Sequence, residues 1–270
     1  MNRPDHSHLH TFAVCAYGDS PFLKECLESL KQQTVKSRIL LATSTPSPFL
    51  EGIAREYELE YHISPRKGEG IAADWEFALQ CASTPYCTIT HQDDLYLPEY
   101  AERVVAALED SASSLICFTN NADKMPDGRI LKNRFYLIVK RLLLLPFYLK
   151  RSWSSRFVKL WILRFGNSIC CPSVTYNLAR LKEVKFDRNF TVNLDWAMWL
   201  ELARRKGSFV YLRKVLFCHR LSSLMESSAA IADSRRFRED QQIFSALWPG
   251  LIAGLLLRFY SRCYKSNVSK

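Results

Sequence analysis

Short apolar runs alternate with amphipathic stretches through the first half of this chain. Apolar runs bounded by turn residues predict buried strands, and apolar positions spaced three and four apart predict helices. The predicted strands cover residues 12–16, 38–42, 61–63, 86–90 and 115–118, and the predicted helices cover 21–30, 50–57, 71–82 and 98–108. Alternation at this spacing predicts an α/β fold with a mostly parallel sheet flanked by helices.

The turns that follow the predicted strands are the expected place for a ligand. In a parallel sheet these turns meet at one edge, so those after Ala16, Ala42 and Thr90 should lie together. Neither of the first two turns carries a Gly-x-Gly-x-x-Gly or a P-loop pattern. The sequence therefore disfavours a Rossmann dehydrogenase and a P-loop enzyme. The first helix should begin at Ser20 and Pro21, which suit an N-cap and a first helical position.

The second half of the chain contains one segment that breaks this pattern. Residues 130–165 are basic, aromatic and rich in leucine, which predicts amphipathic helices there. Apolar positions after Asp195 then predict a helix that begins at this residue and ends before Gly207. The other predicted elements are strands at 173–176, 209–212 and 215–217 and an apolar helix at 247–260.

The positive charge is concentrated in the same segment. Residues 124–165 contain eleven Lys or Arg and one acid, Asp127, which equals the whole formal net charge of +10. Such an excess predicts a local anionic partner. Cations interleaved with Leu, Phe and Trp over residues 129–164 are typical of a helix on an anionic membrane surface. A solvated helical hairpin packed on the domain explains the pattern equally well, and nucleic acid is disfavoured because no nucleic-acid module is recognisable.

The cysteines and the N-terminus indicate where the protein works. Nine cysteines without a Cys-x-x-Cys pair favour a reduced, cytoplasmic location. Residues 1–10 are polar and lack the apolar core of a signal peptide. The longest apolar run, 142–149, contains Pro146 and is too short to span a bilayer. We therefore expect a cytoplasmic protein, peripheral on the inner face of the plasma membrane if the basic segment binds lipid.

Acidic residues lie at the boundaries of two predicted elements. Asp93 and Asp94 come after the strand at 86–90, and carboxylates on such a loop can hold a divalent cation together with substrate phosphates. A solvated turn explains the same pair, since Asp is common in turns. Asp195 opens a helix, where it could serve as a general base. Asp is also a preferred N-cap, so the helix boundary alone explains this residue too.

Taken in order, four stretches resemble the motifs of family 2 glycosyltransferases, which have the GT-A fold. They lie within residues 11–225 and comprise the opening strand and helix at 13–17 and 23–33, the segment 70–79, the region 91–98 and the element 194–200. The last two resemble the family's Asp-x-Asp region and its Glu-Asp-Trp-x-x-Trp-Leu element. Their order and their separation both fit, which makes this pair more specific than either motif alone.

The resemblance implies an inverting, metal-dependent glycosyltransferase of the bacterial cell-surface polysaccharide type. It would move a sugar from a nucleotide-diphospho-sugar donor to a saccharide acceptor, often lipid-linked in this class, with Mn²⁺ or Mg²⁺ as cofactor. We expect one GT-A domain over residues 1–270. Its parts would be a nucleotide-sugar-binding half (11–125), a basic amphipathic insert (126–168), a half with the acceptor site and catalytic base (169–225) and a helical tail (226–270).

The same resemblance gives individual residues their roles. It implies that Asp195 is the catalytic base and that Asp93, Asp94 and His219 hold the metal. His219 belongs to a stretch that resembles the family's late Arg-x-His-x-x-Ser region, although a structural histidine is the alternative. The residues expected to contact the nucleotide-sugar are Ala16, Tyr17, Thr43, Asp74, His91 and Asp93.

Three positions depart from the family's pattern. His91 replaces the first Asp of the Asp-x-Asp region, which makes Asp93 the expected direct metal ligand and Asp94 its helper. Leu194 replaces the Glu before the catalytic base. Thr43 stands where the second strand usually ends in an Asp that reads the nucleotide base, so the base is not specified. Two other functions stay open: a non-catalytic GT-A-like module that binds a glycan or membrane, and a nucleotidyltransferase of similar fold.

Overall fold

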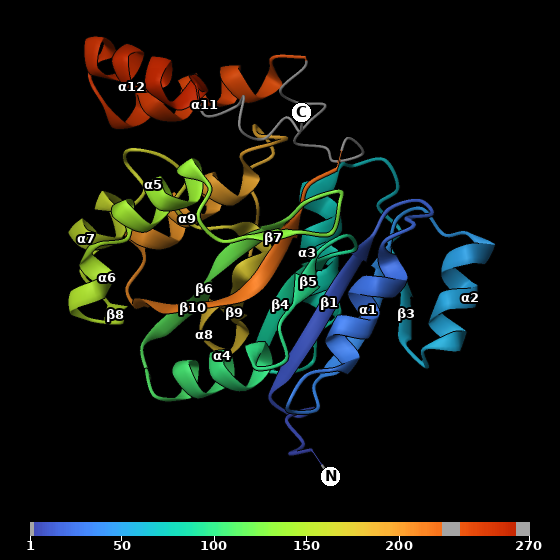
Figure 1. Ribbon diagram of the computed structural model, residues 1–270. Helices are drawn as coiled ribbons and strands as arrows, with labels where there is room; N and C mark the ends of the chain where they lie inside the picture. The colour runs from blue at the N-terminus through green and yellow to red at the C-terminus, as the bar shows by residue number, and fades with distance from the viewer. Residues whose placement is uncertain (1–2, 223–232, 263–270) are drawn as a thin grey trace.

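One mixed sheet organises the protein, whose computed structural model describes residues 3–222 and 233–262 (Figure 1). Within these residues the sheet has ten strands, in the order β3-β2-β1-β4-β9-β6-β10-β5, with β7 beside β6 and β8 beside β10. The strands are β1 (His10–Ala16), β2 (Arg38–Thr43), β3 (Glu60–Ile63), β4 (Tyr86–His91), β5 (Leu95–Tyr96), β6 (Ser114–Lys124), β7 (Ile130–Leu131), β8 (Ser152–Trp153), β9 (Val174–Asn177) and β10 (Ser208–Arg220).

Helices cover both faces of this sheet. They are α1 (Leu23–Lys31), α2 (Pro48–Glu56), α3 (Ile71–Cys81), α4 (Tyr100–Glu109), α5 (Phe135–Leu143), α6 (Pro146–Leu149), α7 (Arg156–Trp161), α8 (Leu178–Leu181), α9 (Leu194–Arg204), α11 (Arg235–Leu247) and α12 (Gly250–Arg262). The expected α/β class is confirmed. The pairs β3–β2, β2–β1, β1–β4 and β6–β10 are parallel, whereas β9 runs antiparallel to both β4 and β6.

Alternate side chains of β1 enter two separate hydrophobic cores, as the two-residue period of a strand requires. Phe12 and Val14 pack with α1, α2 and α4 on one face, and Ala13 packs with α3 and α9 on the other. Phe12 and Val14 are fully buried. The continuous apolar run from residue 12 to 16 is therefore explained by burial of the strand on both faces.

Several predicted boundaries are wrong in informative ways. Helix α1 begins at Leu23, because Ser20 and Pro21 form a turn in which the Ser20 carbonyl accepts from the Leu23 amide at 3.3 Å. Helix α9 begins at Leu194 with Asn193 at its N-cap, so Asp195 is not the cap. The two strands expected at 209–212 and 215–217 are one strand, β10, whose register shifts between Leu212 and Phe217.

The basic insert packs one side on the domain and exposes the other. Leu137, Phe147 and Ile162 are buried in the core, whereas Phe135 and Phe157 are exposed. One cation of the segment is structural: Lys159 is fully buried, and its Nζ donates to the carbonyls of Arg205 and Gly207 at 2.8 and 2.7 Å. Burial lowers the pKa of Lys159 to about 8.

The C-terminal helices α11 and α12 lie at the top of the molecule, above α5 and α9 in the view of Figure 1. The apolar helix expected at 247–260 is α12, which begins at Gly250 because the chain turns at Trp248 and Pro249 after α11. The remaining parts of the predicted tail, 226–232 and 263–270, fall outside the described residues. Among the described helices, none combines the length and the apolar character that crossing a bilayer requires.

Gly207 joins α9 to β10 and offers a test of this connection. Its φ is +127°, and a Cβ there would lie 2.7 Å from Leu115 Cδ2 and 2.8 Å from the Ser113 carbonyl oxygen. We predict that Gly207→Ala lowers the free energy of unfolding by about 1–3 kcal/mol, because the backbone is strained and the neighbours must move. Urea unfolding measures this value.

Gly52 is the matched control for that substitution. It lies within α2, and a Cβ there would meet nothing within 4 Å. Gly52→Ala should raise stability by about 0.5–1 kcal/mol, because alanine favours the helix. Equal unfolding midpoints for the Gly207 variant and the parent would contradict the account of this connection.

Candidate active site

A cavity of about 960 Å³ opens at the edge where the parallel strands end. Ala16 ends β1 and Tyr17 follows it, while His91 ends β4 and Asp93 follows shortly after. Adjacent parallel strands therefore bring these residues together. Asp74 of α3, Asp195 of α9 and His219 of β10 line the same cavity. Of the predicted site residues, only Thr43 and Asp94 are absent from its lining.

The loops after β1 and β4 are tied together by a residue that the sequence did not single out. The Gln92 side chain accepts from the Tyr17 amide at 3.2 Å and donates to the Tyr17 carbonyl at 2.9 Å. This reciprocal pair fixes the backbone after both strands. Tyr17 itself is 68 % exposed and forms part of the cavity mouth.

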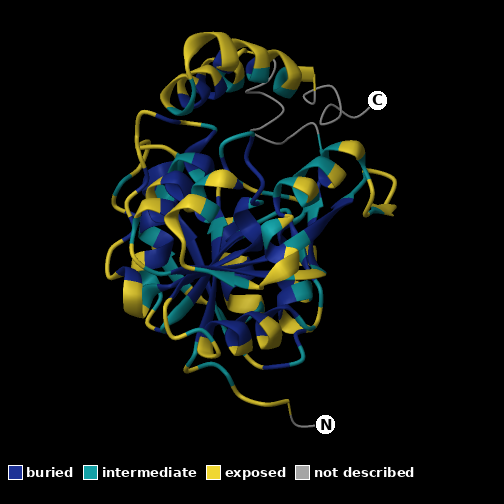
Figure 2. Cartoon of the chain, turned by 90° about the vertical axis from the view of Figure 1, so that its left-hand side faces the viewer, coloured by how far each residue is buried: buried dark blue, intermediate teal, exposed yellow. Residues whose placement is uncertain are grey.

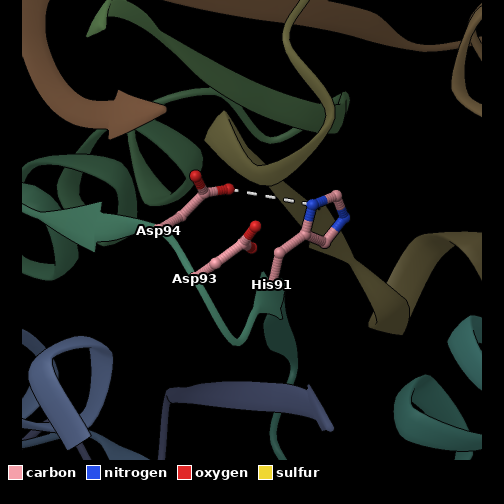
Figure 3. Close-up of side chains that lie close together, drawn as sticks. All are labelled: His91, Asp93 and Asp94. Carbon is pink, nitrogen blue, oxygen red and sulfur yellow. Dashed lines mark ion pairs between the residues drawn. The ribbon is translucent and has the colours of Figure 1, made fainter. Parts of the chain in front are cut away.

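His91, Asp93 and Asp94 form the one cluster in the described part of the chain with the composition and spacing of a cation site (Figure 3). One ligand atom of each residue lies within 4.8 Å of the others. Asp94 is 1 % exposed, and its Oδ2 has no hydrogen-bond partner among the described residues; the same holds for His91 Nε2. Unsatisfied buried acceptors beside a second carboxylate fit a divalent cation.

The protonation of this cluster depends on its burial. Burial raises the pKa of Asp94 well above its usual value, and the charge of Asp93 adds to this effect. Burial lowers the pKa of His91, and Asp93 opposes that shift. A bound cation would oppose this shift of Asp94, since metal binding favours deprotonated ligands.

Arg220 stabilises the loop that contains Asp93 and Asp94. Its amide donates to Asp94 Oδ1 at 2.9 Å, and its Nε donates to the Asp93 carbonyl at 2.7 Å. Its guanidinium also pairs with Glu25 at 2.5 Å and lies over the Phe22 ring at 4.4 Å. The side chain of Asp93 is left to face the cavity.

Asp195 is the second residue of α9, and it lines the cavity. Asn167 Nδ2 donates to Asp195 Oδ2 at 2.7 Å, and the Trp196 amide donates to Oδ1 at 2.7 Å. Burial raises the pKa of Asp195, and the bond from Asn167 opposes the shift. A carboxylate with a raised pKa is a stronger proton acceptor, as a general base requires.

His219 belongs to β10 and lines the same cavity as Asp93 and Asp195. Its Nδ1 lies 4.0 Å from Asp123 Oδ1, and burial lowers its pKa to about 4. A neutral imidazole can bind a metal. Asp123, which is fully buried, also pairs with Arg134 at 3.0 Å and accepts from the Tyr136 hydroxyl, so it anchors the start of α5 to the sheet.

The part of the cavity that follows β2 differs from the sequence prediction at one position. Thr43 is 2 % exposed, and its hydroxyl accepts from the Thr45 amide at 3.0 Å, so it supports the turn from within. Ser44 lines the cavity instead and hydrogen-bonds Asp74. Trp75 stacks on His91 with ring centroids 5.3 Å apart, which fixes the imidazole.

Cationic residues that sequence reasoning did not assign also line the cavity. Lys140 comes from α5 of the insert, Arg188 from the loop before α9, and Arg235 and Arg236 from α11. The concentration of Lys and Arg in the insert was visible in the sequence. The sequence does not show which of these side chains reach the cavity, because that depends on how α5 and α11 pack.

Solved structures of other proteins share this architecture. S. aureus TarS residues 1–349 in complex with UDP-GlcNAc superpose with a TM-score of 0.59 at 16% identity, covering 95% of this chain and 73% of that one. Mannosyltransferase PcManGT from Pyrobaculum calidifontis, in complex with GDP-Man and Mn²⁺, gives 0.59 at 15% identity, covering 98% and 71%. The fold is therefore the GT-A fold of nucleotide-sugar transferases.

The sequence family follows from a separate match. The family model described as "Glycosyl transferase family 2" matches residues 11–179, and the chain belongs to this family. A curated relative, the "Putative glycosyltransferase EpsH" of Bacillus subtilis (strain 168), is 23% identical over 108 residues. That alignment spans 38% of this chain and 31% of the relative, less than a third of its length.

Binding of Mn²⁺ in the absence of any sugar tests the cation site. We predict that Asp93→Asn weakens Mn²⁺ binding by about 10–100-fold in isothermal titration calorimetry, because the amide removes the negative charge of a ligand. Asp127→Asn, which changes an exposed carboxylate outside the cavity, should bind Mn²⁺ like the parent. Equal affinity in the Asp93 variant and the parent would place the cation elsewhere.

Proposed function

We propose that this protein transfers a sugar from a nucleotide-diphospho-sugar to a hydroxyl of a saccharide acceptor, with inversion at the anomeric carbon. The observation that carries the proposal is that Asp93 and Asp195, 102 positions apart in the chain, line one cavity. The structural neighbours contain UDP-GlcNAc or GDP-Man, which supports a donor of this class. A lipid-linked saccharide in the cytoplasm is the proposed acceptor.

The proposed donor site combines the loops after β1, β2 and β4. Ala16, Tyr17, Ser44 and Asp74 would contact the nucleotide, with Ser44 in place of Thr43 because it faces the cavity. Asp93 would hold a divalent metal together with Asp94 and His91 of the same cluster, and His219, which lines the same cavity, would be a further ligand. When bound, the metal would act as a Lewis acid on the diphosphate.

Asp195 would act on the acceptor. The acceptor oxygen attacks the anomeric carbon while the bond from that carbon to the diphosphate oxygen breaks, and Asp195 takes the hydroxyl proton. The products are a glycoside and a nucleoside diphosphate. A single displacement inverts the configuration, because the nucleophile enters opposite the leaving group. Asn167 would keep the carboxylate aimed at the acceptor hydroxyl through its 2.7 Å hydrogen bond.

Two other functions make different predictions. A non-catalytic GT-A-like module would bind a glycan without releasing a nucleoside diphosphate. A nucleotidyltransferase would release pyrophosphate and has no need of an acceptor-side base at Asp195. The partly buried Asp195, with its raised pKa, favours the glycosyltransferase. Product analysis across a panel of UDP-sugars and GDP-sugars separates the three functions, and EDTA should abolish turnover.

Replacement of the proposed base is the sharper test. We predict that Asp195→Asn lowers the rate of sugar transfer by about 10²–10⁴-fold, because the amide cannot take the proton. Donor affinity, measured by calorimetry, should stay within a few-fold of the parent, as binding and chemistry are separable. Asp110→Asn is the matched control, since that carboxylate is exposed and outside the cavity. Near-parental transfer by the Asp195 variant would remove this residue from the mechanism.

A further inference from the structure

Exposed apolar side chains are concentrated in two segments of the chain. Among the residues that the structure describes, sixteen large hydrophobic side chains are exposed, and fourteen belong to the insert or to the tail helices. Tyr17, at the cavity mouth, and Ile63, on β3, are the other two. The fourteen are Ile130, Phe135, Ile138, Leu142, Leu145, Tyr148, Leu149, Phe157, Trp161, Phe237, Leu251, Ile252, Leu255 and Phe259. Scattered apolar exposure is ordinary, but such concentration marks an interaction surface.

Helical spacing places these side chains on defined faces. In α12, Leu251, Leu255 and Phe259 repeat every four residues on the side away from the buried Ala253 and Leu257. Figure 2 shows that the outward side of α11 and α12 is largely exposed. The outer face of α12 is therefore apolar without a covering element among the described residues.

Direct contacts join the insert to the tail. Arg164 lies over the Trp248 ring at 4.3 Å, and Trp248 Nε1 donates to the Arg164 carbonyl at 2.8 Å. The rings of Phe157, Trp161, Phe165 and Trp248 follow one another, with neighbouring centroids 5.2 to 5.8 Å apart. The exposed end of α7 thus continues into the turn between α11 and α12.

The charge of these segments identifies the partner. Residues 124–165 carry the entire net charge of +10, and α12 contains Arg258 and Arg262 and no acid. We propose that the insert (129–164) and α12 form one docking surface for an anionic lipid bilayer. Apolar side chains would enter the headgroup boundary while the exposed cations meet lipid phosphates. These cations are Arg129, Lys132, Lys150, Arg151, Arg156, Arg258 and Arg262. A second copy of the chain fits this surface poorly, because it would bring the same positive charges together.

Vesicle sedimentation tests this docking surface. We expect the parent to sediment with vesicles of phosphatidylcholine and phosphatidylglycerol, to stay in solution with phosphatidylcholine alone, and to be released by salt. A triple variant of Leu142→Gln, Phe157→Gln and Leu251→Gln should bind on the order of a hundredfold more weakly. Ile63→Gln, which changes an exposed apolar residue on β3, is the matched control and should bind like the parent.

Two results would overturn the docking surface. One is equal recovery of the parent in solution with both kinds of vesicle. The other is a parent that forms a dimer by light scattering and that the triple variant converts to a monomer without any change in lipid binding. Circular dichroism of the triple variant establishes that it is folded.

A separate set of contacts connects the tail helices to the catalytic carboxylate. Glu239 of α11 is 8 % exposed, and its two oxygens accept from the amides of Thr191, Val192 and Asn193 at 2.7 to 3.0 Å. These amides precede the first turn of α9, which has no side-chain cap of its own. A carboxylate at this place satisfies free amides and interacts favourably with the helix dipole. Helix α11 thereby fixes the start of the helix that bears Asp195.

Helix α12 reaches Asp195 through Asn167. The Tyr260 ring covers Gly166, where a Cβ would lie 2.7 Å from Tyr260 Cε2, and the Tyr260 hydroxyl accepts from the Asn167 amide at 3.4 Å. Asn167 in turn donates to Asp195 Oδ2 at 2.7 Å. We infer that α11 and α12 are part of the catalytic site, with Glu239 and Tyr260 as positioning residues for Asp195. This inference rests on the proposed role of Asp195 as the base.

The pKa of Asp195 gives a readout that needs no turnover. The groups that act on it are Asn167, Arg236 of α11, Lys140 of α5 and the Trp196 amide, which favour the ionised form, and His91, Tyr176 and Cys171 also lie near it. Loss of the bond from Asn167 should raise the pKa, because the ionised form loses a donor. NMR of the Asp195 carboxyl carbon across pH measures this directly.

Three variants separate positioning from simple loss of fold. We expect Asn167→Ala to raise the pKa of Asp195. As the pH is lowered, the rate of sugar transfer should therefore begin to fall at a higher pH than in the parent. Tyr260→Phe should give a smaller rise and lower kcat on the order of tenfold, with the KM for the donor unchanged. Tyr57→Phe, which loses a hydroxyl bonded to Glu28 far from the cavity, is the control.

Unchanged pKa values and unchanged kcat in both the Asn167 and Tyr260 variants would overturn the positioning role. Failure of the proposed function would look different. In that case the parent would release no nucleoside diphosphate from any donor, while the pKa of Asp195 would still respond to Asn167→Ala.

Discussion

The site depends on one electrostatic constraint: several carboxylates share a partly buried cavity at the edge where parallel strands end. Asp93 and Asp195 line this cavity, and Asp94 is buried beside Asp93. Burial raises the pKa of Asp94 and of Asp195. The charge of Asp93 also disfavours the ionised form of Asp94, and a cation bound between them would favour it. Arg220 is committed to the loop backbone and Glu25, so it supports the loop rather than neutralising Asp93. A divalent metal beside Asp93 and Asp94 would offset this negative charge.

Much of the fold was predictable because burial dictates it. The apolar runs of β1, β2 and β4 and the helical spacing of α1 and α3 correspond to elements of the structure within a few residues. The direction of β9 and the union of two predicted strands into β10 were not predictable. Both depend on pairing with strands distant in sequence, and periodicity within one segment carries no information about such pairing. Helix α9 illustrates the same limit, since its start is satisfied by Glu239 from far along the chain.

The candidate site shows a similar division. Asp93, Asp195 and His219 were identified from motifs and do line one cavity. Thr43 stands where the family's second strand usually ends in an Asp that reads the nucleotide base, yet its hydroxyl bonds within the turn and Ser44 lines the cavity. Residues from the insert and the tail could not be assigned from the sequence, because their approach to the cavity depends on helix packing. That packing makes both segments candidates for a role in the chemistry and at a membrane surface.

A structure of the protein with Mn²⁺ and a non-hydrolysable UDP-sugar or GDP-sugar would test whether Asp93 and Asp195 act on one donor. We expect the metal on Asp93 and the diphosphate, with the sugar between that metal and Asp195 and its anomeric carbon open to an acceptor on the Asp195 side. A donor bound outside this cavity, or a sugar whose anomeric carbon faces away from Asp195, would contradict this arrangement.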